Sequence, residues 1–350
     1  MIQILFFLSS GLFLGWSLGA NDAANIFGTA VGTKMISFKN AAIICSVFLI
    51  IGAVISGAGA SHTLGKLGAI DTLAGAFIVA LAAAITVLWM TKAGLPVSTS
   101  QAVVGAIIGW NFFAKTATGY GSLTKIVGTW VFSPIIAAAL AFVLFHLVKR
   151  FVENSKIHLL RLDSMTRIAL LIVGAFGSYS LGANNIGNVM GVFIKSSPFQ
   201  NIVISDLIHI SSIQQLFFLG GIAIAIGVFT YSKKVMMTVG SGIFKLSPIA
   251  AFVVVLASSI VLFLFASQGL KHLLTSYGLP SFPLVPVSSS QAVVGSVMGI
   301  SLAKGGRNMN FRILGRISIG WVATPIASAI ISYIALFFMQ NVFMQDTFIR

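Results

Sequence analysis

The residues of this chain best suited to chemistry are a carboxylate and two amides inside an apolar stretch, in the sequence Gly-Ala-Asn-Asp-Ala-Ala-Asn at 19–25. Asp22 is the only carboxylate embedded in an apolar motif. A charge placed there costs at least ~2.5–3.5 kcal/mol, so we expect it to face a cavity or a cation. Asn21 and Asn25 are four residues apart and share one face if the segment is helical. Carboxylate and amide oxygens suit a hard cation such as Na⁺, whereas amide NH₂ groups can donate to an oxyanion.

A second motif, Pro-Val-Ser-(Thr/Ser)-Ser-Gln, places three hydroxyls and an amide at the start of an apolar run, at 96–101 and again at 286–291. Proline suits the first turn of a helix, and serine or threonine caps it. Free N–H groups at a helix N-terminus attract an anion without a charged side chain. One copy is adequately explained as a helix cap. Two copies entering from opposite sides predict one neutral cage of donors at the midplane, with these members: Ser98, Thr99, Ser100, Gln101, Ser288, Ser289, Ser290 and Gln291.

The first motif is also duplicated, and the two motifs keep the same order in both halves. GANDAANIFGTAVGTK at 19–34 is echoed by GANNIGNVMGVFIK at 182–195. The second copy repeats the polar positions with Asn184, Asn185 and Asn188, and Asn185 stands where the first copy has its carboxylate. A duplicated apolar chain with matched polar segments is typical of secondary transporters, whose site lies between the repeats.

The composition makes the lipid bilayer the solvent of this chain. Of its 350 residues, 57% are hydrophobic and 8% charged, and the mean hydropathy is +1.03. A soluble chain of this length could not bury so much apolar surface. Ten apolar stretches follow one another, at 2–33, 40–62, 71–91, 96–113, 123–148, 167–194, 201–231, 246–270, 284–303 and 313–343.

Five segments in each half is an odd number, so the second half must enter from the opposite side. We therefore predict an all-α polytopic membrane protein with two inverted-topology repeats, at 1–148 and 167–350, joined by a charged linker at 149–166. The halves also match at four positions outside the motifs: Trp130 with Trp321, and Pro134 with Pro325.

The segments that carry the motifs are expected to be irregular. The stretch at 2–33 is too long for a plain span and has its motif in the middle, which predicts a broken or tilted helix. The Pro-led stretches at 96–113 and 284–303 are short, and both crossing and re-entrant arrangements are compatible with their length.

Positive charge predicts the orientation. If the N-terminus is outside and all ten stretches cross, fifteen of the 21 lysines and arginines fall inside and six outside, as the positive-inside rule requires. Both termini would then lie outside the cell membrane, and the linker at 149–166 would be cytoplasmic. Lys34 and Lys195 end the two motif segments and are expected to snorkel at opposite interfaces. Residues 2–18 lack the basic flank of a signal peptide and are interpreted as a retained first helix.

Several other classes of protein are disfavoured. The net charge is +15, but no basic stripe runs through a polar surface, which argues against nucleic-acid binding. Cys45 is the single cysteine, so neither an intrachain disulfide nor a thiolate metal cluster is possible. The chain has no P-loop and no serine with a recognisable basic partner, so we expect no enzyme and no cofactor beyond a coupling ion. A passive anion channel would need no fixed carboxylate.

The paired motifs, in order over nearly the whole chain, resemble the signature regions of the PiT family, the sodium- or proton-coupled inorganic phosphate transporters. This resemblance implies an inverted-repeat transporter, often a homodimer, with phosphate held between the repeats. It implies alternating access coupled to a cation, with Na⁺ favoured over H⁺. Related sulfate permeases share the scaffold, so sulfate is the alternative substrate.

By position, the resemblance also assigns roles to residues. It implies phosphate binding by Asn21, Asn25, Asn184 and Asn188 together with the eight cage residues. It implies cation binding by Asp22, Asn25, Asn185 and Asn188, with Na⁺ at Asp22. The chain departs from the family pattern in two ways. Asn185 replaces an aspartate, and Gln101 and Gln291 replace a histidine after the hydroxyls, which leaves the number of coupled cations open.

Overall fold

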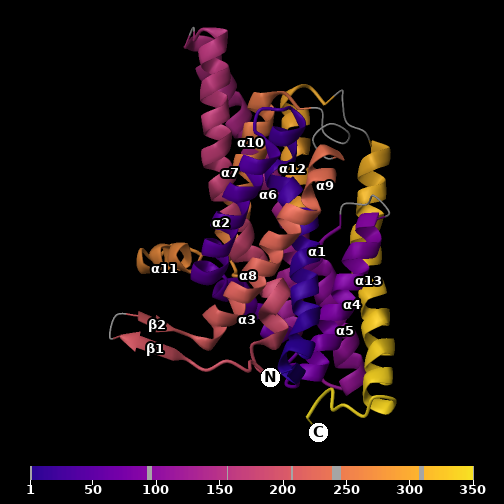
Figure 1. Ribbon diagram of the computed structural model, residues 1–350. Coiled ribbons are helices and arrows are strands. Elements are labelled where there is room, and N and C mark those ends of the chain that lie inside the picture. The colour runs from indigo at the N-terminus through magenta and orange to yellow at the C-terminus, as the bar shows by residue number, and fades with distance from the viewer. Residues whose placement is uncertain are drawn as a thin grey trace.

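The computed structural model describes residues 2–92, 97–155, 157–205, 208–238, 246–306 and 311–349, and it is helical nearly throughout (Figure 1). In the first half the elements are α1 (Ile2–Gly32), α2 (Phe38–Ser56), α3 (Ala58–Leu67), α4 (Leu73–Lys92), α5 (Thr99–Ala114) and α6 (Tyr120–Asn154). In the second half they are α7 (Leu159–Met190), η1 (Gly191–Phe193), β1 (Ile202–Ser205), β2 (Ile208–Ile210), α8 (Ser212–Thr230), α9 (Ser232–Thr238), α10 (Pro248–Ala266), α11 (Gln268–Ser276), α12 (Ser289–Ala303) and α13 (Phe311–Asn341).

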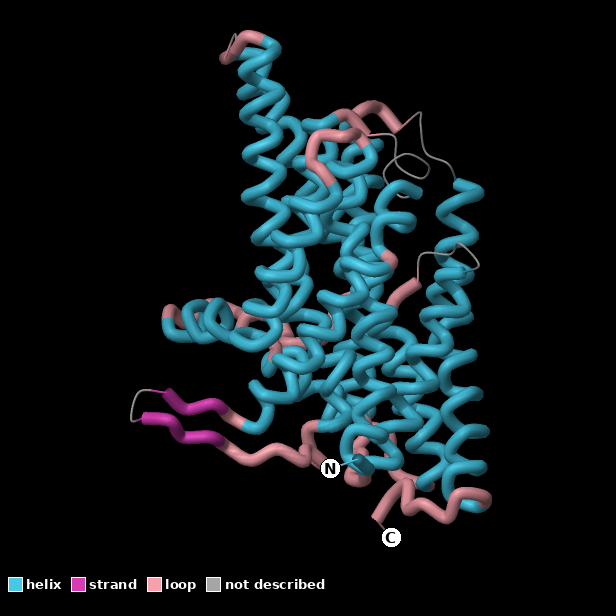
Figure 2. Tube along the Cα trace, viewed as in Figure 1, coloured by secondary structure: helices cyan, strands magenta, loops and turns pink. Residues whose placement is uncertain are grey.

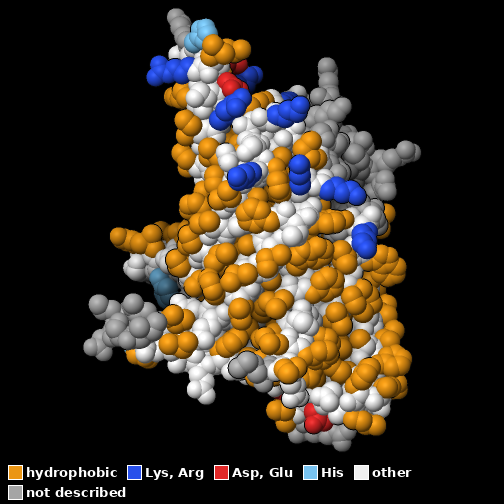
Figure 3. Space-filling model, in the orientation of Figure 1, with side chains coloured by type: hydrophobic (Ala, Val, Ile, Leu, Met, Phe, Trp, Pro, Cys, Tyr) orange, Lys and Arg blue, Asp and Glu red, His pale blue; other side chains and the backbone are white. Residues whose placement is uncertain are grey.

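Seven of the described helices have the length and apolar composition of membrane spans, namely α1, α2, α4, α6, α8, α10 and α13. Large apolar side chains are exposed along the outer helices, such as Phe132 on α6 and Ile326 on α13. Apolar side chains also cover the middle of the face in Figure 3. An exposed apolar surface of this kind faces lipid, so the predicted all-α polytopic membrane architecture is confirmed.

The two halves pack against each other through reciprocal pairs of helices. α2 packs on α7, and α1 packs on α8. Glycines let the backbones touch at both contacts, because a Cβ on Gly52 would overlap the carbonyl of Tyr179, and a Cβ on Gly227 would overlap that of Trp16. Two further contacts are reciprocal in the same way: Gly182 with the Leu49 carbonyl, and Gly19 with the Ile224 carbonyl.

The short motif helices exchange partners between the halves. α5 of the first half packs on α13, and α12 of the second half packs on α6. Gly105 meets the backbone of Pro325, and Gly295 meets the backbone of Pro134, so the prolines matched in the sequence occupy matched places. Such interwoven, reciprocal contacts are what a twofold relation between two repeats produces.

The ends of the chain and the junction between the halves lie at opposite ends of the molecule. The N- and C-termini are together in Figure 1, and the α6–α7 junction projects at the other end. This charged linker is mostly the ends of two long helices, not a loop, since α6 reaches Asn154 and α7 begins at Leu159. Lysines and arginines gather at the linker end of the face in Figure 3, as the predicted charge asymmetry requires. Some residues of the charge analysis lie outside the described residues: Lys156, Lys245, Arg307 and Arg350, and the side chains of Arg312 and Arg316.

The irregularity expected at the motifs is found at the second motif only. α1 is a continuous helix through its motif, so the expected break is wrong: the motif contains no proline, and Gly19 serves close packing. α5 occupies the half of the molecule near the termini and α12 the half near the linker, and each is paired with its preceding helix, as in re-entrant hairpins (Figure 1).

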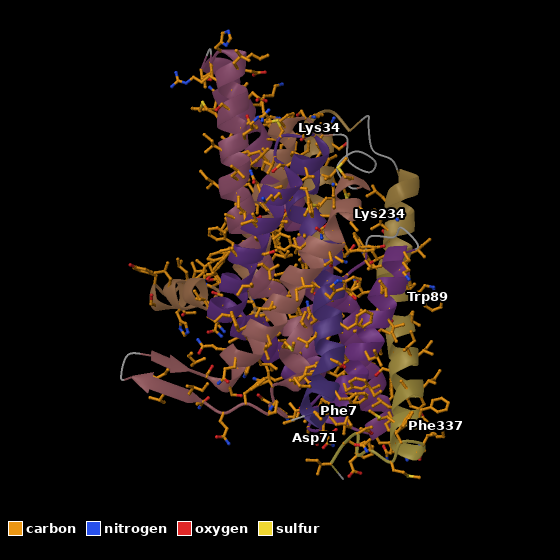
Figure 4. All side chains as sticks on the ribbon, viewed as in Figure 1. Phe7, Lys34, Asp71, Trp89, Lys234 and Phe337 are labelled. Atoms are coloured by element: carbon orange, nitrogen blue, oxygen red, sulfur yellow. The ribbon has the colours of Figure 1, made fainter. Side chains whose placement is uncertain are left out.

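One smaller expectation is also corrected, and another falls outside the described residues. Trp89, one turn before the end of α4, lies lower in the view than Lys34 and Lys234 (Figure 4), so α4 stops short of the linker end. Lys92, the last residue of α4, is one of the fifteen basic residues that the charge analysis assigned to the inside, and this assignment is corrected. Pro96 lies outside the described residues.

The stretch at 201–231 is not a single helix. It begins with the antiparallel hairpin of β1 and β2, which projects beside the bundle as the magenta strands of Figure 2. α8 then starts at Ser212, where Ser211 and Gln214 form a reciprocal capping box.

Candidate functional site

The four motif copies meet in the interior between the halves. α1 carries its Asn/Asp motif in mid-helix and α7 carries its copy in the last turns, while α5 and α12 start at the hydroxyl motifs, so each half contributes one of each kind. Asp22 and Asn185 are each only 1% exposed, and Asn184 and Asn188 are fully buried. Buried polar groups require partners, and these residues find most of them in one another.

Asp22 is the acceptor at the centre of the first-half side. Its Oδ1 accepts from Asn21 Nδ2 at 3.0 Å. Its Oδ2 accepts from Ser289 Oγ at 2.7 Å and from Asn185 Nδ2 at 3.2 Å. Asn25, which is half-buried, donates to Ser289 Oγ at 3.3 Å. The carboxylate is therefore held by groups from α1, α7 and α12, and all the donors are neutral.

Asn185 occupies the matching position on the second-half side. Its Oδ1 accepts from Asn184 Nδ2 and from Asn188 Nδ2, each at 3.0 Å. Asn188 also donates to Ser100 Oγ at 2.9 Å. Asn185 thus accepts from its own helix and donates across the interface to Asp22, which joins the two sides in one network.

A main-chain group that the sequence did not point to completes the second-half side. Asn184 Nδ2 donates to the carbonyl of Val287 at 2.7 Å, and the Val287 N–H donates back to Asn184 Oδ1 at 2.9 Å. Ser100 Oγ also donates to the Val287 carbonyl at 3.3 Å. Backbone groups have no residue-type signature, so the only available signal was the place of Val287 just before the hydroxyls.

The hydroxyl motifs divide into caps and ligand-like groups. Ser98 Oγ accepts from the Gln101 N–H at 3.3 Å, and Ser288 Oγ accepts from the Gln291 N–H at 3.2 Å, so both serines cap their helices. Ser288 also shares a hydrogen bond of 3.1 Å with Ser290. Four buried oxygens of the motifs have no hydrogen-bond partner among the described residues: Thr99 Oγ1, Gln101 Oε1, Asn188 Oδ1 and Gln291 Oε1.

The donors and acceptors of this cluster are of the kinds that bind ions. It contains one carboxylate, that of Asp22, and otherwise only neutral amides, hydroxyls and backbone groups of the residues described above. Hard oxygens around a single negative charge suit a small cation. Neutral N–H and O–H donors, with two helix N-termini, suit an oxyanion. Among the described residues no group of histidine, cysteine and acidic side chains has the arrangement of a transition-metal site.

Comparisons with known proteins agree with this chemistry. The sequence model of the phosphate transporter family matches residues 18–332, with a further match over 274–347. A predicted phosphate permease of Methanocaldococcus jannaschii is 28% identical over 333 residues, which cover 95% of this chain and 97% of the relative. A sulfate permease of Bacillus subtilis is 29% identical over 332 residues, which cover 92% of this chain and 84% of the relative.

A solved structure has the same fold. It is described as the sodium-dependent phosphate transporter, and it superposes with a TM-score of 0.72 at 24% sequence identity. The match covers 96% of this chain and 99% of the other.

Proposed function

The chain belongs to the phosphate transporter family, and on that premise we propose that it is a secondary active transporter that carries inorganic phosphate together with a cation. The observation that carries the proposal is the meeting of all four motif copies in one buried network around Asp22. A multiply charged oxyanion buried near this carboxylate needs compensating charge, because an unpaired charge in the membrane interior is costly. A co-transported cation supplies that charge.

We propose Na⁺ in preference to H⁺ as the coupling ion. Both oxygens of Asp22 already point at polar groups, and the Ser289 hydroxyl lies 2.7 Å from Oδ2. The Asp22 carboxylate and the Ser289 hydroxyl bring oxygens of α1 and α12 together, and a hard cation takes oxygen ligands of this kind. Asn25, which contacts Ser289, extends this side of the site, and Asn185 and Asn188 supply amide oxygens on the other.

The unpartnered oxygens favour phosphate over sulfate. Hydrogen phosphate carries O–H groups at neutral pH, whereas sulfate carries none and can only accept hydrogen bonds. Amide oxygens such as Gln101 Oε1 and Gln291 Oε1 accept from an O–H and have no other partner among the described residues. Overall sequence identity does not separate the two substrates, since the sulfate permease and the phosphate permease are equally distant relatives.

Alternating access is supported by the reciprocal packing of the halves. Each half contributes a long motif helix and a re-entrant hairpin, and matched glycines make matched contacts. Two halves of this kind can exchange conformations and so expose a midplane site to either end in turn. We place the repeats at 1–148 and 167–350, with the termini outside and the 149–166 linker cytoplasmic, because basic side chains gather at the linker end (Figure 3).

Uptake into proteoliposomes tests the proposal. Purified protein is supplied with labelled phosphate, and Na⁺ and H⁺ gradients are imposed separately, with sulfate as a competitor. We expect the Na⁺ gradient to drive phosphate above its equilibrium level and sulfate to compete weakly. Uptake that only equilibrates phosphate would identify a passive channel, and uptake of sulfate in preference to phosphate would identify a sulfate permease.

A further inference from the structure

A cavity of about 630 Å³ is lined by residues of α3, α6, α8 and α11, in the half of the molecule nearer the termini. Basic side chains line it: His62, Lys66, Lys125, Lys271 and His272. A smaller cavity of about 260 Å³ shares His62 and Lys66 with it and adds Lys195. We call these two connected spaces the basic vestibule.

The basic vestibule concentrates positive charge from separate parts of the chain. Lys66 is on α3 and Lys125 on α6, while Lys195 follows η1 and Lys271 is on α11. Among the described residues, no acidic side chain lines either cavity. Two ion pairs are found among the described residues, Lys149–Glu153 and Arg167–Asp163, and both are at the α6–α7 junction. The four exposed lysines of the basic vestibule therefore form no ion pair with a described carboxylate. Asp71 lies at the same end of the molecule but contacts the backbone of Ile349 instead (Figure 4).

The floor of the basic vestibule is the outer side of the ion-binding network. Ser61 lines both cavities and packs directly on Gly187, which lies between Asn185 and Asn188 in the second-half motif. Thr63 donates to the carbonyl of Leu284 at 2.5 Å. Leu284 is three residues before Val287, whose backbone is bound by Asn184. Ser61 therefore lies between the cavities and the second-half motif.

The second half contains an element that builds this wall and has no counterpart among the described residues of the first half. Between α10 and α12 the chain forms α11, which brings Lys271 and His272 to the cavity. Between α4 and α5 only residues 93–98 intervene. The basic vestibule is thus an addition to the repeat architecture, not a consequence of it.

We propose that the basic vestibule is an anion-recruiting site, which gathers oxyanions of the charge of hydrogen phosphate from solution and delivers them to the buried network. The inference rests on the proposed function. A concave surface lined by charge of one sign focuses the field and raises the local concentration and arrival rate of the opposite charge, by about 10–10³-fold in favourable cases. Because lysines act here as point charges, the basic vestibule recruits anions without selecting among oxyanions, and selection is left to the buried amides and hydroxyls.

Charge replacement by chemical modification tests this. Cys45 is the only cysteine and is fully buried, so cysteines introduced at exposed positions can be modified selectively. Lys66→Cys, Lys125→Cys and Lys271→Cys are combined, and uptake is measured before and after treatment, on both faces of the membrane, with a membrane-impermeant cationic or anionic methanethiosulfonate. Lys39→Cys, an exposed position at the start of α2 near the opposite end, is the matched control.

We expect the triple variant to raise the KM for phosphate roughly tenfold with unchanged maximal rate. The cationic reagent should restore the KM, the anionic reagent should raise it further, and Lys39→Cys should respond to neither. Raising the ionic strength with an untransported salt should shrink the difference between wild type and variant. A KM that is unchanged in the triple variant, or that responds equally to both reagents, would overturn the proposal.

Anionic lipid headgroups present the same phosphate chemistry, so the measurement is repeated in vesicles of neutral phosphatidylcholine and in vesicles with added anionic lipid. The same change in KM in both supports recruitment of free phosphate. A change confined to anionic vesicles would assign the lysines to lipid and overturn the proposal. If wild type carries no phosphate under any gradient, the proposed function itself fails, which is distinct from phosphate uptake that ignores the lysines.

Discussion

The two halves of the polar network contain nearly the same residues at matched positions, yet they are bonded differently. On the first-half side Asp22 only accepts, from Asn21, Ser289 and Asn185. On the second-half side Asn185 accepts from Asn184 and Asn188 and also donates to Asp22. One change of residue type, carboxylate to amide, thus turns a second acceptor into a donor.

This difference determines how many negative charges lie between the two halves. The Asn185 Nδ2 and Asp22 Oδ2 atoms lie 3.2 Å apart. Two carboxylates at this separation would need a proton or a cation between them. In this chain the amide N–H fills that position, so the two halves can close on each other with a single negative charge between them. We therefore expect the number of bound cations to depend on this difference between the two sides, a carboxylate at Asp22 and an amide at Asn185, and not on how many polar residues the network contains.

The largest effect on transport is expected when the one carboxylate of the network is removed. Asp22→Asn should reduce cation-driven phosphate uptake by more than about 100-fold, because no anionic ligand for the cation is left. The measurement is initial uptake rate in proteoliposomes under a Na⁺ gradient. Asp71→Asn, which changes a half-buried carboxylate at the end near the termini, is the control and should keep wild-type rates. Wild-type coupling in Asp22→Asn would contradict the assignment.

Substitution of the packing glycines tests whether the helix crossings of the two halves are equivalent. Gly19→Ala and Gly182→Ala should lower stability to a similar extent, by about 1–3 kcal/mol or more, since each added Cβ overlaps a backbone carbonyl of the facing helix. Thermal unfolding of the detergent-solubilised protein measures this. Gly128→Ala on α6 has open space around its Cβ and should be neutral or stabilising. Unequal losses at Gly19 and Gly182 would argue against equivalent helix crossings in the two halves.

Substitution of two matched hydroxyls tests the difference in bonding between the two sides of the network. Ser289 donates to Asp22, whereas the matching Thr99 hydroxyl has no partner among the described residues. Ser289→Ala should raise the Na⁺ concentration for half-maximal uptake by roughly tenfold, the effect of one lost hydrogen bond to a charged group. Thr99→Val should leave it within about twofold while raising the KM for phosphate. The opposite pattern would place the cation on the second-half side.

Much of this arrangement follows from the sequence, because duplication is visible in it. The matched motifs and the matched prolines, Pro134 and Pro325, predicted two repeats, and their reciprocal contacts agree. The continuity of α1 was not predicted, since a long apolar run with a polar centre reads equally well as a broken helix. Replacement of one motif aspartate by Asn185 was visible too, but its donation to Asp22 was not, because an amide pattern does not show which atom donates.

Other features have no sequence signal at all. The bonding of Asn184 to the Val287 backbone depends on where a re-entrant hairpin ends, which side-chain types do not encode. Ser98 and Ser288 cap their helices, as their place in the motif predicted, and their part in a donor cage stays a prediction. The basic vestibule draws lysines from four separate segments, so only the folded chain brings them together.

We predict that Asp22 provides the one site that binds Na⁺ without phosphate. On the side of Asn185, which has no carboxylate, Na⁺ should bind only when phosphate is present. Calorimetric titration of Na⁺ into the purified protein, with and without phosphate, tests this most directly, in wild type and in Asn185→Asp. In wild type we predict one Na⁺ bound without phosphate, and any second Na⁺ only when phosphate is present. Asn185→Asp should gain a second site that needs no phosphate. Two tight Na⁺ sites in wild type without phosphate would contradict the account.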